Sequence, residues 1–235
     1  MIELYGMTSP NVRKVFFMLE DCGLPYRFHH VQVFQGDQFR PGFVRLNPNS
    51  KVPVIVDDEG PAGTPYRVFE SGAILLYLAE KTGLFLPREG SRRYDVMQWL
   101  MLQMASVGPM FGQLNHFRHF SEGNDYAFQR YEHETLRLFA VLETRLGESP
   151  YLAGDEYSIA DIATYPWAMY HEQYGFDWSD RPQVKRWCDL IAARPAVQRG
   201  LAALDAVLPD DRRSMQEADP ADVDRFLNRS WLRRG

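Results

Sequence analysis

The sequence is poor in cysteine: Cys22 and Cys188 are the only two among its 235 residues. They lie far apart, and neither belongs to a C-x-x-C motif. A disulfide framework needs several cysteines, and a structural zinc site needs clustered cysteine or histidine ligands. The sequence therefore argues against a disulfide-stabilised scaffold and predicts that the protein holds no metal.

Long apolar runs are also missing. The run from Ala73 to Ala79 has seven residues, whereas a membrane-spanning helix needs about 20. The opening residues, Met1–Tyr5, show neither the basic region nor the apolar stretch of a signal peptide. We therefore expect no membrane partner and a cytoplasmic location.

Positive charge is neither abundant nor clustered. The 26 lysines and arginines are scattered along the chain and are outnumbered by 31 acidic residues, which gives a net charge of −5. Nucleic-acid-binding proteins carry basic stripes or patches, so we expect no nucleic-acid partner. The hydrophobic content of 45% is enough to bury a sizeable core in one large or two small domains.

One informative segment spans residues 47–56. It is a polar turn followed by Val52-Pro53 and a β-branched run. Proline lacks a backbone N–H and disrupts a central strand, and X-Pro is the only common cis peptide. A cis bond here would turn the Val52 N–H and C=O outward, where an extended peptide can pair with them.

A second segment, residues 67–75, is a short strand that ends at Glu70 and passes into a helix at Ser71. Open amides at a helix N-terminus favour a carboxylate, and the Ser71 hydroxyl adds a donor. Glu70 offers a carboxylate to an ammonium group. Each segment alone is typical of an ordinary X-Pro turn or a serine helix cap. Together, in this order, they predict a site for a small, zwitterionic, peptide-like ligand.

The first eighty residues alternate between strand and helix patterns. Apolar residues at helical spacing, with Pro10 near the start and Gly23 past the end, predict a first helix. Strands are predicted over residues 2–5, 26–33, 54–56 and 67–69, a loop with a short helix over 35–46 and a helix over 71–81. The order β-α-β-(α)-β-β-α predicts a thioredoxin-like layout with a mixed sheet.

Strand patterns vanish after Pro87. Helices are predicted over residues 93–120, 125–147, 159–173, 183–193 and 196–204, and Ser158 and Asp161 form a start like a capping box. The charged, proline-interrupted stretch beyond Asp205 predicts a loosely packed tail with one short helix around residues 221–232. We expect an α/β thioredoxin-like domain over residues 1–84, an all-α domain over 91–205 and a C-terminal extension over 206–235.

This arrangement resembles the cytosolic glutathione transferases over the chain up to about residue 205. The resemblance rests on Asn47-Pro-x-x-Lys-Val-Pro53, Phe69-Glu-Ser-Gly-Ala-Ile-Leu-Leu-Tyr-Leu78 and Tyr157-Ser-Ile-Ala-Asp-Ile-Ala163. A finer similarity is to the bacterial Nu class, through Thr8-Ser9-Pro10-Asn11, Gly36-Asp-Gln-Phe-Arg-Pro41, Gln98-Trp99-Leu100 and Gly108-Pro-Met-Phe-Gly-Gln113. That class includes glutathione-dependent disulfide-bond oxidoreductases and is related to the yeast nitrogen-catabolite regulator.

The resemblance implies that residues 1–84 bind glutathione. Glu70 and Ser71 would hold the γ-glutamyl ammonium and carboxylate groups. The Val52 backbone, next to Pro53, would pair with the cysteinyl unit.

The remaining contacts implied by the resemblance involve the glycyl carboxylate, the sulfur and the interface of a dimer. Gln38 and Lys51 would reach the glycyl carboxylate, and Asn11 would lie beside the sulfur. Arg130 would help to hold glutathione across the interface of a homodimer. Gln38 is also typical of an ordinary polar loop residue, and Arg130 of a solvated helix charge.

In this reading the reacting thiol belongs to glutathione as co-substrate. Related redox proteins carry a nucleophilic cysteine before the proline, where this chain has Ser9. A free thiol has a pKa near 8.5, and lowering it by ~2 units needs roughly 2.7 kcal/mol of thiolate stabilisation. Asn11, Ser9 and Thr8 are the candidate donors, with Asn11 and Ser9 favoured. The Nu class carries threonine at the position of Ser9, so the primary donor stays open.

The resemblance favours reduction of a small disulfide, with weak conjugating or peroxidase activity alongside. One alternative is a transferase that conjugates glutathione to small electrophiles. Another is a non-catalytic glutathione-binding regulatory module, since fold does not fix function. A third is a specialised dehalogenase, isomerase or lignin-ether-cleaving enzyme on the same scaffold.

Overall fold

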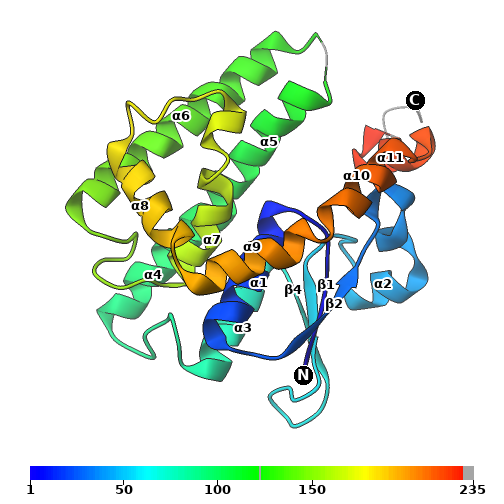
Figure 1. The fold of residues 1–235 in the computed structure, drawn as a ribbon, viewed down its shortest axis with the longest axis horizontal. Coiled ribbons are helices and arrows are strands. Elements are labelled where there is room, and N and C mark those ends of the chain that lie inside the picture. Colours follow the sequence, from blue (N-terminus) through cyan, green and yellow to red (C-terminus); the bar gives the residue numbers. More distant parts are fainter. Residues whose placement is uncertain (122, 230–235) are drawn as a thin grey trace. The chain divides into compact units, whose positions relative to one another are not determined.

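The computed structural model describes residues 1–121 and 123–229 (Figure 1). The chain divides into two compact units. One contains Met1–Tyr77 with Ala196 and the described residues after it, and the other contains Leu78–Pro195. These bounds differ from the predicted 1–84, 91–205 and 206–235, because the C-terminal extension packs with the first unit.

The first unit is built on a four-stranded mixed sheet with the strand order β2-β1-β3-β4. Its strands are β1 (Ile2–Gly6), β2 (Tyr26–His30), β3 (Val54–Asp57) and β4 (Tyr66–Phe69). Strand β1 pairs in parallel with β2, whereas β1 with β3 and β3 with β4 are antiparallel. This confirms the predicted thioredoxin-like topology, because the parallel pair is joined through a helix and the antiparallel pair by a short connection.

The helices of this unit are α1 (Pro10–Cys22), α2 (Pro41–Leu46) and the part of α3 (Ser71–Thr82) up to Tyr77. The unit also contains the short 3₁₀ segments η1 (Val33–Gln35) and η2 (Asp37–Phe39). Helix α9 (Pro195–Asp205) lies against α1 at Gly200. A Cβ atom at Gly200 would come within 2.8 Å of the Phe17 ring, so glycine permits this close approach. Arg199 and Glu20 form an ion pair of 2.7 Å between the same two helices.

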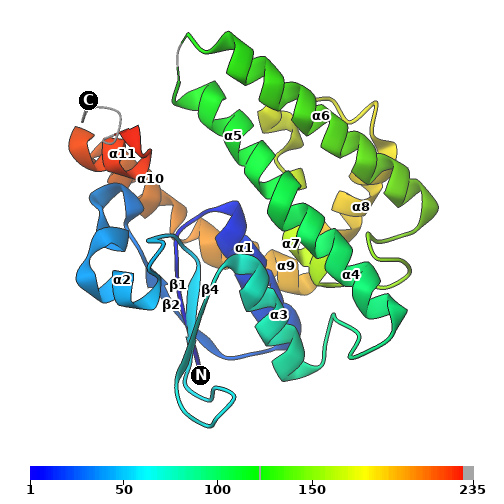
Figure 2. The ribbon, with the colours of Figure 1, turned by 180° about the vertical axis from the view of Figure 1, so that it is seen from behind.

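The tail is packed, so the prediction of a loose extension with one helix is wrong. It forms two helices, α10 (Leu208–Gln216) and α11 (Pro220–Phe226), which lie beside the η1–α2 stretch (Figures 1 and 2). Phe226 joins a hydrophobic cluster around Phe34, with 5.0 Å between the ring centroids. The part of the predicted helix beyond residue 229 lies outside the described residues.

The second unit is helical. Its elements are α4 (Ser91–Leu102), the π-helical segment η3 (Gln103–Val107), α5 (Gly108–His119), α6 (Asp125–Glu148), α7 (Ile159–Ala168), the 3₁₀ segment η4 (His171–Tyr174) and α8 (Pro182–Ala192). Helices α5 and α6 run side by side (Figure 2). The predicted helix over residues 93–120 is interrupted by η3, next to Pro109, whose missing N–H breaks the regular ladder. The predicted helix over residues 159–173 ends earlier, at Ala168.

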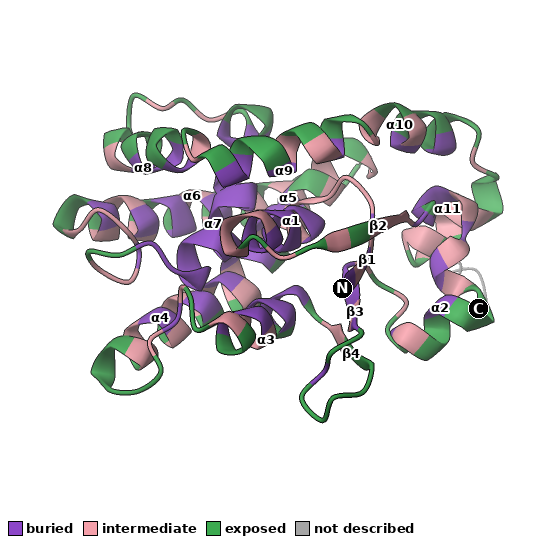
Figure 3. Cartoon of the chain, turned by 60° about the horizontal axis from the view of Figure 1, so that its bottom comes forward, coloured by how far each residue is buried: buried purple, intermediate pink, exposed green. Residues whose placement is uncertain are grey.

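Helix α7 is the core of the second unit, and all ten of its residues are buried (Figure 3). It begins at the predicted capping box, in which the Ser158 N–H donates to Asp161 at 3.0 Å. Asp161 is 0% exposed and also accepts hydrogen bonds from the Leu152 N–H and the Trp187 indole N–H. Burial raises the pKa of this carboxyl group. No helix in the described part of the chain is long and apolar enough to cross a membrane.

Candidate functional site

Strand register brings three of the predicted segments to one end of the sheet. Tyr5 pairs with Val54, and Val54 pairs with Phe69. Three segments therefore leave the sheet at the same end of its strands, which we call the sheet edge: the one after β1, the one before β3 and the one after β4. These three segments carry Thr8–Asn11, Lys51–Pro53 and Glu70–Ser71.

Helix α1 begins within this edge. Ser9 is its N-cap residue, with an extended backbone and a side chain that accepts a long 3.4 Å hydrogen bond from the Val12 N–H. Among the described residues, no acceptor engages the Ser9 hydroxyl hydrogen. Asn11 is half-buried at the second helical position. The start of α1 thus offers a hydroxyl, an amide side chain and the open amides of a helix N-terminus.

Thr8 is engaged elsewhere. Its N–H and its hydroxyl both donate to Oδ2 of Asp211, at 2.7 and 2.6 Å. A hydroxyl group has one hydrogen to donate, so as placed Thr8 has none left for a sulfur. This observation separates Thr8 from Ser9, which the sequence could not do.

The Val52-Pro53 peptide bond is cis, the isomer that the sequence analysis considered for this site. Val52 lies two residues before the first paired residue of β3. Within the described residues, no hydrogen bond engages the Val52 backbone. The preceding turn is held by Asn47, whose side-chain amide donates to the Lys51 carbonyl at 2.7 Å and whose oxygen accepts from the Asn49 N–H. The turn therefore presents the Val52 N–H and C=O for pairing with an extended ligand.

Glu70 adopts a left-handed backbone conformation with φ 69° and is exposed. This region disfavours side chains other than glycine and asparagine, and strained residues of this kind gather at binding sites. The next residue, Ser71, is 3% exposed and opens α3. An exposed carboxylate thus stands beside the open amides of a helix N-terminus.

A buried lysine lies beneath this point. Lys14 of α1 is 0% exposed, and its Nζ donates to Oγ of Ser71 at 3.2 Å. Burial lowers the pKa of Lys14 to about 7, an effect that the negative charge of Glu70 partly opposes. The region behind Ser71 therefore carries a titratable positive charge, which sequence reasoning missed. A single lysine within the otherwise apolar stretch from Val12 to Leu19 is the signal that could have revealed it.

Gln38 is buried within the η1–η2 stretch. Its side chain is 2% exposed, and Nε2 donates to the Val33 carbonyl at 3.0 Å. As placed, Gln38 braces the η1–η2 turn. Lys51 is exposed, and its Nζ lies 5.6 Å from the centre of the Phe226 ring in α11.

Arg130 lies in the helical unit, on the exposed side of α6. It borders a shallow hollow in the described surface together with Tyr126, Gln129, His133, Glu134 and Arg137. Glu134 and Arg137 form an ion pair of 2.7 Å. The hollow is open, and none of the residues that border it is a cysteine.

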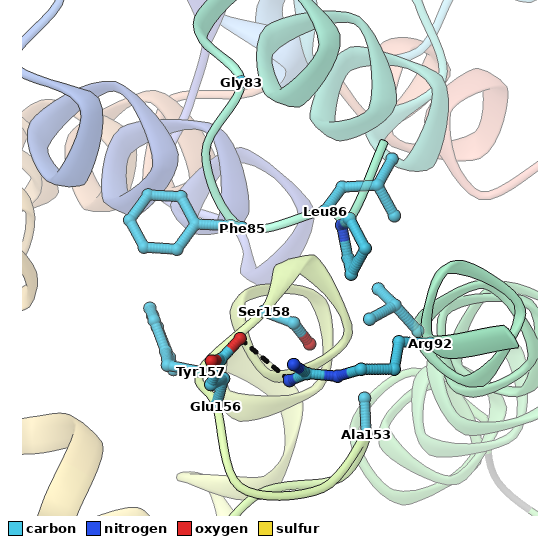
Figure 4. A pocket seen from close by; sticks show the side chains of 10 residues that line it. Gly83, Phe85, Leu86, Arg92, Ala153, Glu156, Tyr157 and Ser158 are labelled. Carbon is cyan, nitrogen blue, oxygen red and sulfur yellow. Dashed lines mark ion pairs between the residues drawn. The ribbon is translucent and has the colours of Figure 1, made fainter. Parts of the chain in front are cut away.

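Another hollow of the helical unit, about 280 Å³ in volume, is bordered by the Gly83–Pro87 segment and by Ala153, Tyr157 and Ser158 (Figure 4). Its charged groups face each other, with Arg92 and Glu156 in an ion pair of 2.8 Å. Within residues 1–121 and 123–229, no three His, Cys, Asp or Glu side chains gather as a metal site requires.

Comparison with known proteins identifies the fold. The glutathione S-transferase N-terminal domain model matches residues 8–81, and the C-terminal domain model matches residues 99–195. The chain belongs to the glutathione S-transferase family. The disulfide-bond oxidoreductase YfcG of Escherichia coli is 48% identical over 215 residues, which cover 90% of this chain and 99% of YfcG.

Solved members of the family share the architecture. A glutathione transferase family member from Pseudomonas fluorescens, with two glutathione molecules bound, has a TM-score of 0.81 and 44% identity, covering 85% of this chain and 92% of that one. A glutathione transferase from Pseudomonas putida, with one glutathione disulfide bound per subunit, also has a TM-score of 0.81, with 42% identity over 85% of this chain and 90% of that one. Both confirm a thioredoxin-like domain followed by an all-α domain.

Proposed function

We propose that the chain is a glutathione-dependent disulfide-bond oxidoreductase, with glutathione bound at the sheet edge of the first unit. The observation that carries the proposal is that no protein thiol lies at the start of α1. Ser9 precedes Pro10, and Cys22 lies at the far end of the helix, about 18 Å away at 1.5 Å per residue. Cys188 is buried in α8, where burial raises its pKa. The reacting thiol therefore comes from a co-substrate.

The charges at the sheet edge fit the two ends of glutathione. Glu70 receives the γ-glutamyl ammonium group, and Ser71 with the first amides of α3 receives the neighbouring carboxylate. The Val52 backbone, next to Pro53, pairs with the cysteinyl unit. Lys51 is the cation nearest to this turn in sequence and would meet the glycyl carboxylate. Gln38 would have to leave its present hydrogen bond to contribute.

Asn11 and Ser9 stabilise the thiolate. Each offers a neutral donor at the N-terminus of α1, where the helix dipole also favours negative charge. Lowering the thiol pKa by ~2 units from ~8.5 needs roughly 2.7 kcal/mol. Two charge-assisted hydrogen bonds of about 1.5–3 kcal/mol each are sufficient.

The reaction proceeds by two thiol–disulfide exchanges. The first glutathione thiolate attacks one sulfur of the substrate disulfide, forms a mixed disulfide and releases the other sulfur as a thiolate. A second glutathione thiolate attacks the glutathione sulfur of the mixed disulfide and releases the remaining substrate thiolate. The substrate gains two electrons and two protons, and two glutathiones become one glutathione disulfide.

The solved relatives support this scheme, because one holds two glutathione molecules and another holds one glutathione disulfide per subunit. We propose a homodimer as well, in which Arg130 reaches the glutathione of the neighbouring subunit. Weak transferase or peroxidase activity would use the same thiolate. The cytoplasm, where glutathione keeps thiols reduced, suits this activity.

A turnover assay with glutathione and 2-hydroxyethyl disulfide, coupled to glutathione reductase, tests the proposal. We expect turnover that requires glutathione and saturates with it. Glutathione uptake in a calorimeter without turnover would instead indicate a regulatory module. Turnover with a small aryl halide but with no disulfide would indicate a conjugating transferase.

A further inference from the structure

Helix α10 lies outside both matched family domains, which end at residue 195, yet it contributes a buried carboxylate to the first unit. Asp211 lies in the first turn of α10 and is 4% exposed. Three donors surround it: the Thr8 N–H at 2.7 Å, the Thr8 hydroxyl at 2.6 Å and the His30 Nε2 at 2.7 Å. A buried carboxylate is tolerated when hydrogen bonds replace its lost hydration, and both oxygens of Asp211 accept one or more.

The three hydrogen bonds join elements that meet at the thiol site. Thr8 belongs to the segment between β1 and α1, one residue before the N-cap Ser9 and three before Asn11. His30 ends β2 and pairs in register with Gly6, the last residue of β1. Oδ2 takes both Thr8 donors and Oδ1 takes His30. The carboxylate therefore fixes the position and the direction of the Thr8 peptide where the chain turns into α1.

We propose that Asp211 is a positioning residue for the thiolate site: by holding Thr8, it fixes Ser9 and Asn11 relative to the glutathione sulfur. The inference rests on the proposed function. Asp211 does not touch the sulfur and acts through the segment that does. It also commits the Thr8 hydroxyl to a carboxylate, which leaves the donation to sulfur to Ser9 and Asn11.

The test compares two substitutions at one position. Asp211→Ala removes all three acceptor contacts. Asp211→Asn keeps an oxygen for the two Thr8 donors and turns an amide N–H toward His30, whose neutral ring can accept it. Asp210→Ala is the matched control, because Asp210 lies on the same helix and pairs with Arg213 at 2.5 Å on the exposed surface.

We expect Asp211→Ala to lower kcat about 10- to 100-fold, because small misplacements of reacting groups cost up to about 10²-fold. The KM for glutathione should change less than about threefold, since the groups that hold its ends are untouched. Asp211→Asn should regain most of the lost kcat. The acid limb of the pH profile of kcat should move to higher pH in Asp211→Ala and return in Asp211→Asn, which a merely structural contact would not produce.

A kcat and pH profile of Asp211→Ala equal to those of Asp210→Ala would overturn the inference while leaving the proposed function intact. If the wild-type chain shows no glutathione-dependent turnover, the proposed function fails and the inference fails with it. If Asp211→Ala does not fold, Thr8→Val replaces it, because this change removes one donor and keeps the N–H. An unchanged kcat in Thr8→Val would then count against the inference, and a loss of about threefold or more would support it.

Discussion

Replacing Lys14 by methionine should stabilise the protein at neutral pH. The ammonium group is fully buried and donates a hydrogen bond to Ser71. Burial lowers the pKa of Lys14 from its ordinary value of 10.5 to about 7. Below pH 7, folding therefore takes a charged group out of water, which a methionine of similar length does not require.

The magnitude follows from proton linkage. Between pH 7 and 10.5 the unfolded chain binds more protons than the folded chain, so the free energy of unfolding contributed by Lys14 rises with pH across this window. The free energy of unfolding changes by about 1.4 kcal/mol per pH unit in this window. Over the whole interval from about 7 to 10.5, the change amounts to roughly 5 kcal/mol. The lost hydrogen bond costs about 1 kcal/mol. At pH 7 the Lys14→Met variant should therefore be more stable by roughly 4 kcal/mol.

Urea unfolding at pH 6.5, 7.5, 8.5 and 9.5 measures the difference directly. The advantage of Lys14→Met over the wild type should shrink by about 1.4 kcal/mol per pH unit above pH 7. Lys185→Met, at an exposed lysine paired with Asp189, is the matched control for the loss of a lysine. A Lys14→Met difference that does not change with pH would refute the reasoning. A buried lysine beside Ser71 that lowers the free energy of unfolding at neutral pH is the pattern expected of a functional site.

Three further predictions concern the site and the core. Asn11→Ala should lower kcat more than it weakens glutathione binding, whereas Glu70→Ala should chiefly weaken binding; steady-state kinetics and calorimetry on both variants check this, and the reverse pattern would contradict the roles. Tyr5→Phe should keep turnover within about twofold, because its ring stacks on His29 at 4.5 Å and its hydroxyl has no part in the scheme; a large loss in the same assay would reassign the thiolate donor. Asp161→Ala should destabilise the chain by at least about 3 kcal/mol in urea unfolding, because it leaves buried donors unsatisfied; a loss below 1 kcal/mol would argue against that network.

Local signals in the sequence were sufficient for much of the fold. The Ser158 capping box and the strand pattern of the first unit were predicted, because each depends on residues close together in the chain. The prediction of a loose tail was wrong because the contacts of the tail are distant in the chain. Its charged, proline-rich composition is typical of a loose segment, but Phe226 finds its partner at Phe34, nearly two hundred residues earlier.

In the candidate site, too, some residues could be predicted from local sequence and others could not. The sequence pointed to Glu70, Ser71 and Val52 because strand ends and turns are recognisable from a few consecutive residues. Gln38 was included by resemblance, and its burial against Val33 became visible only in the folded chain.

The amino-acid sequence alone determined the thioredoxin-like order of elements, the helical second half and the lack of a nucleophilic cysteine before Pro10, since these follow from periodicity and residue identity. Tertiary structure decided which hydroxyl remains available to a ligand sulfur and where a lysine is buried. The reason is physical: the Thr8 proton and the Lys14 charge are fixed by groups 203 and 57 residues away in the chain, and such contacts exist only after folding has brought them together.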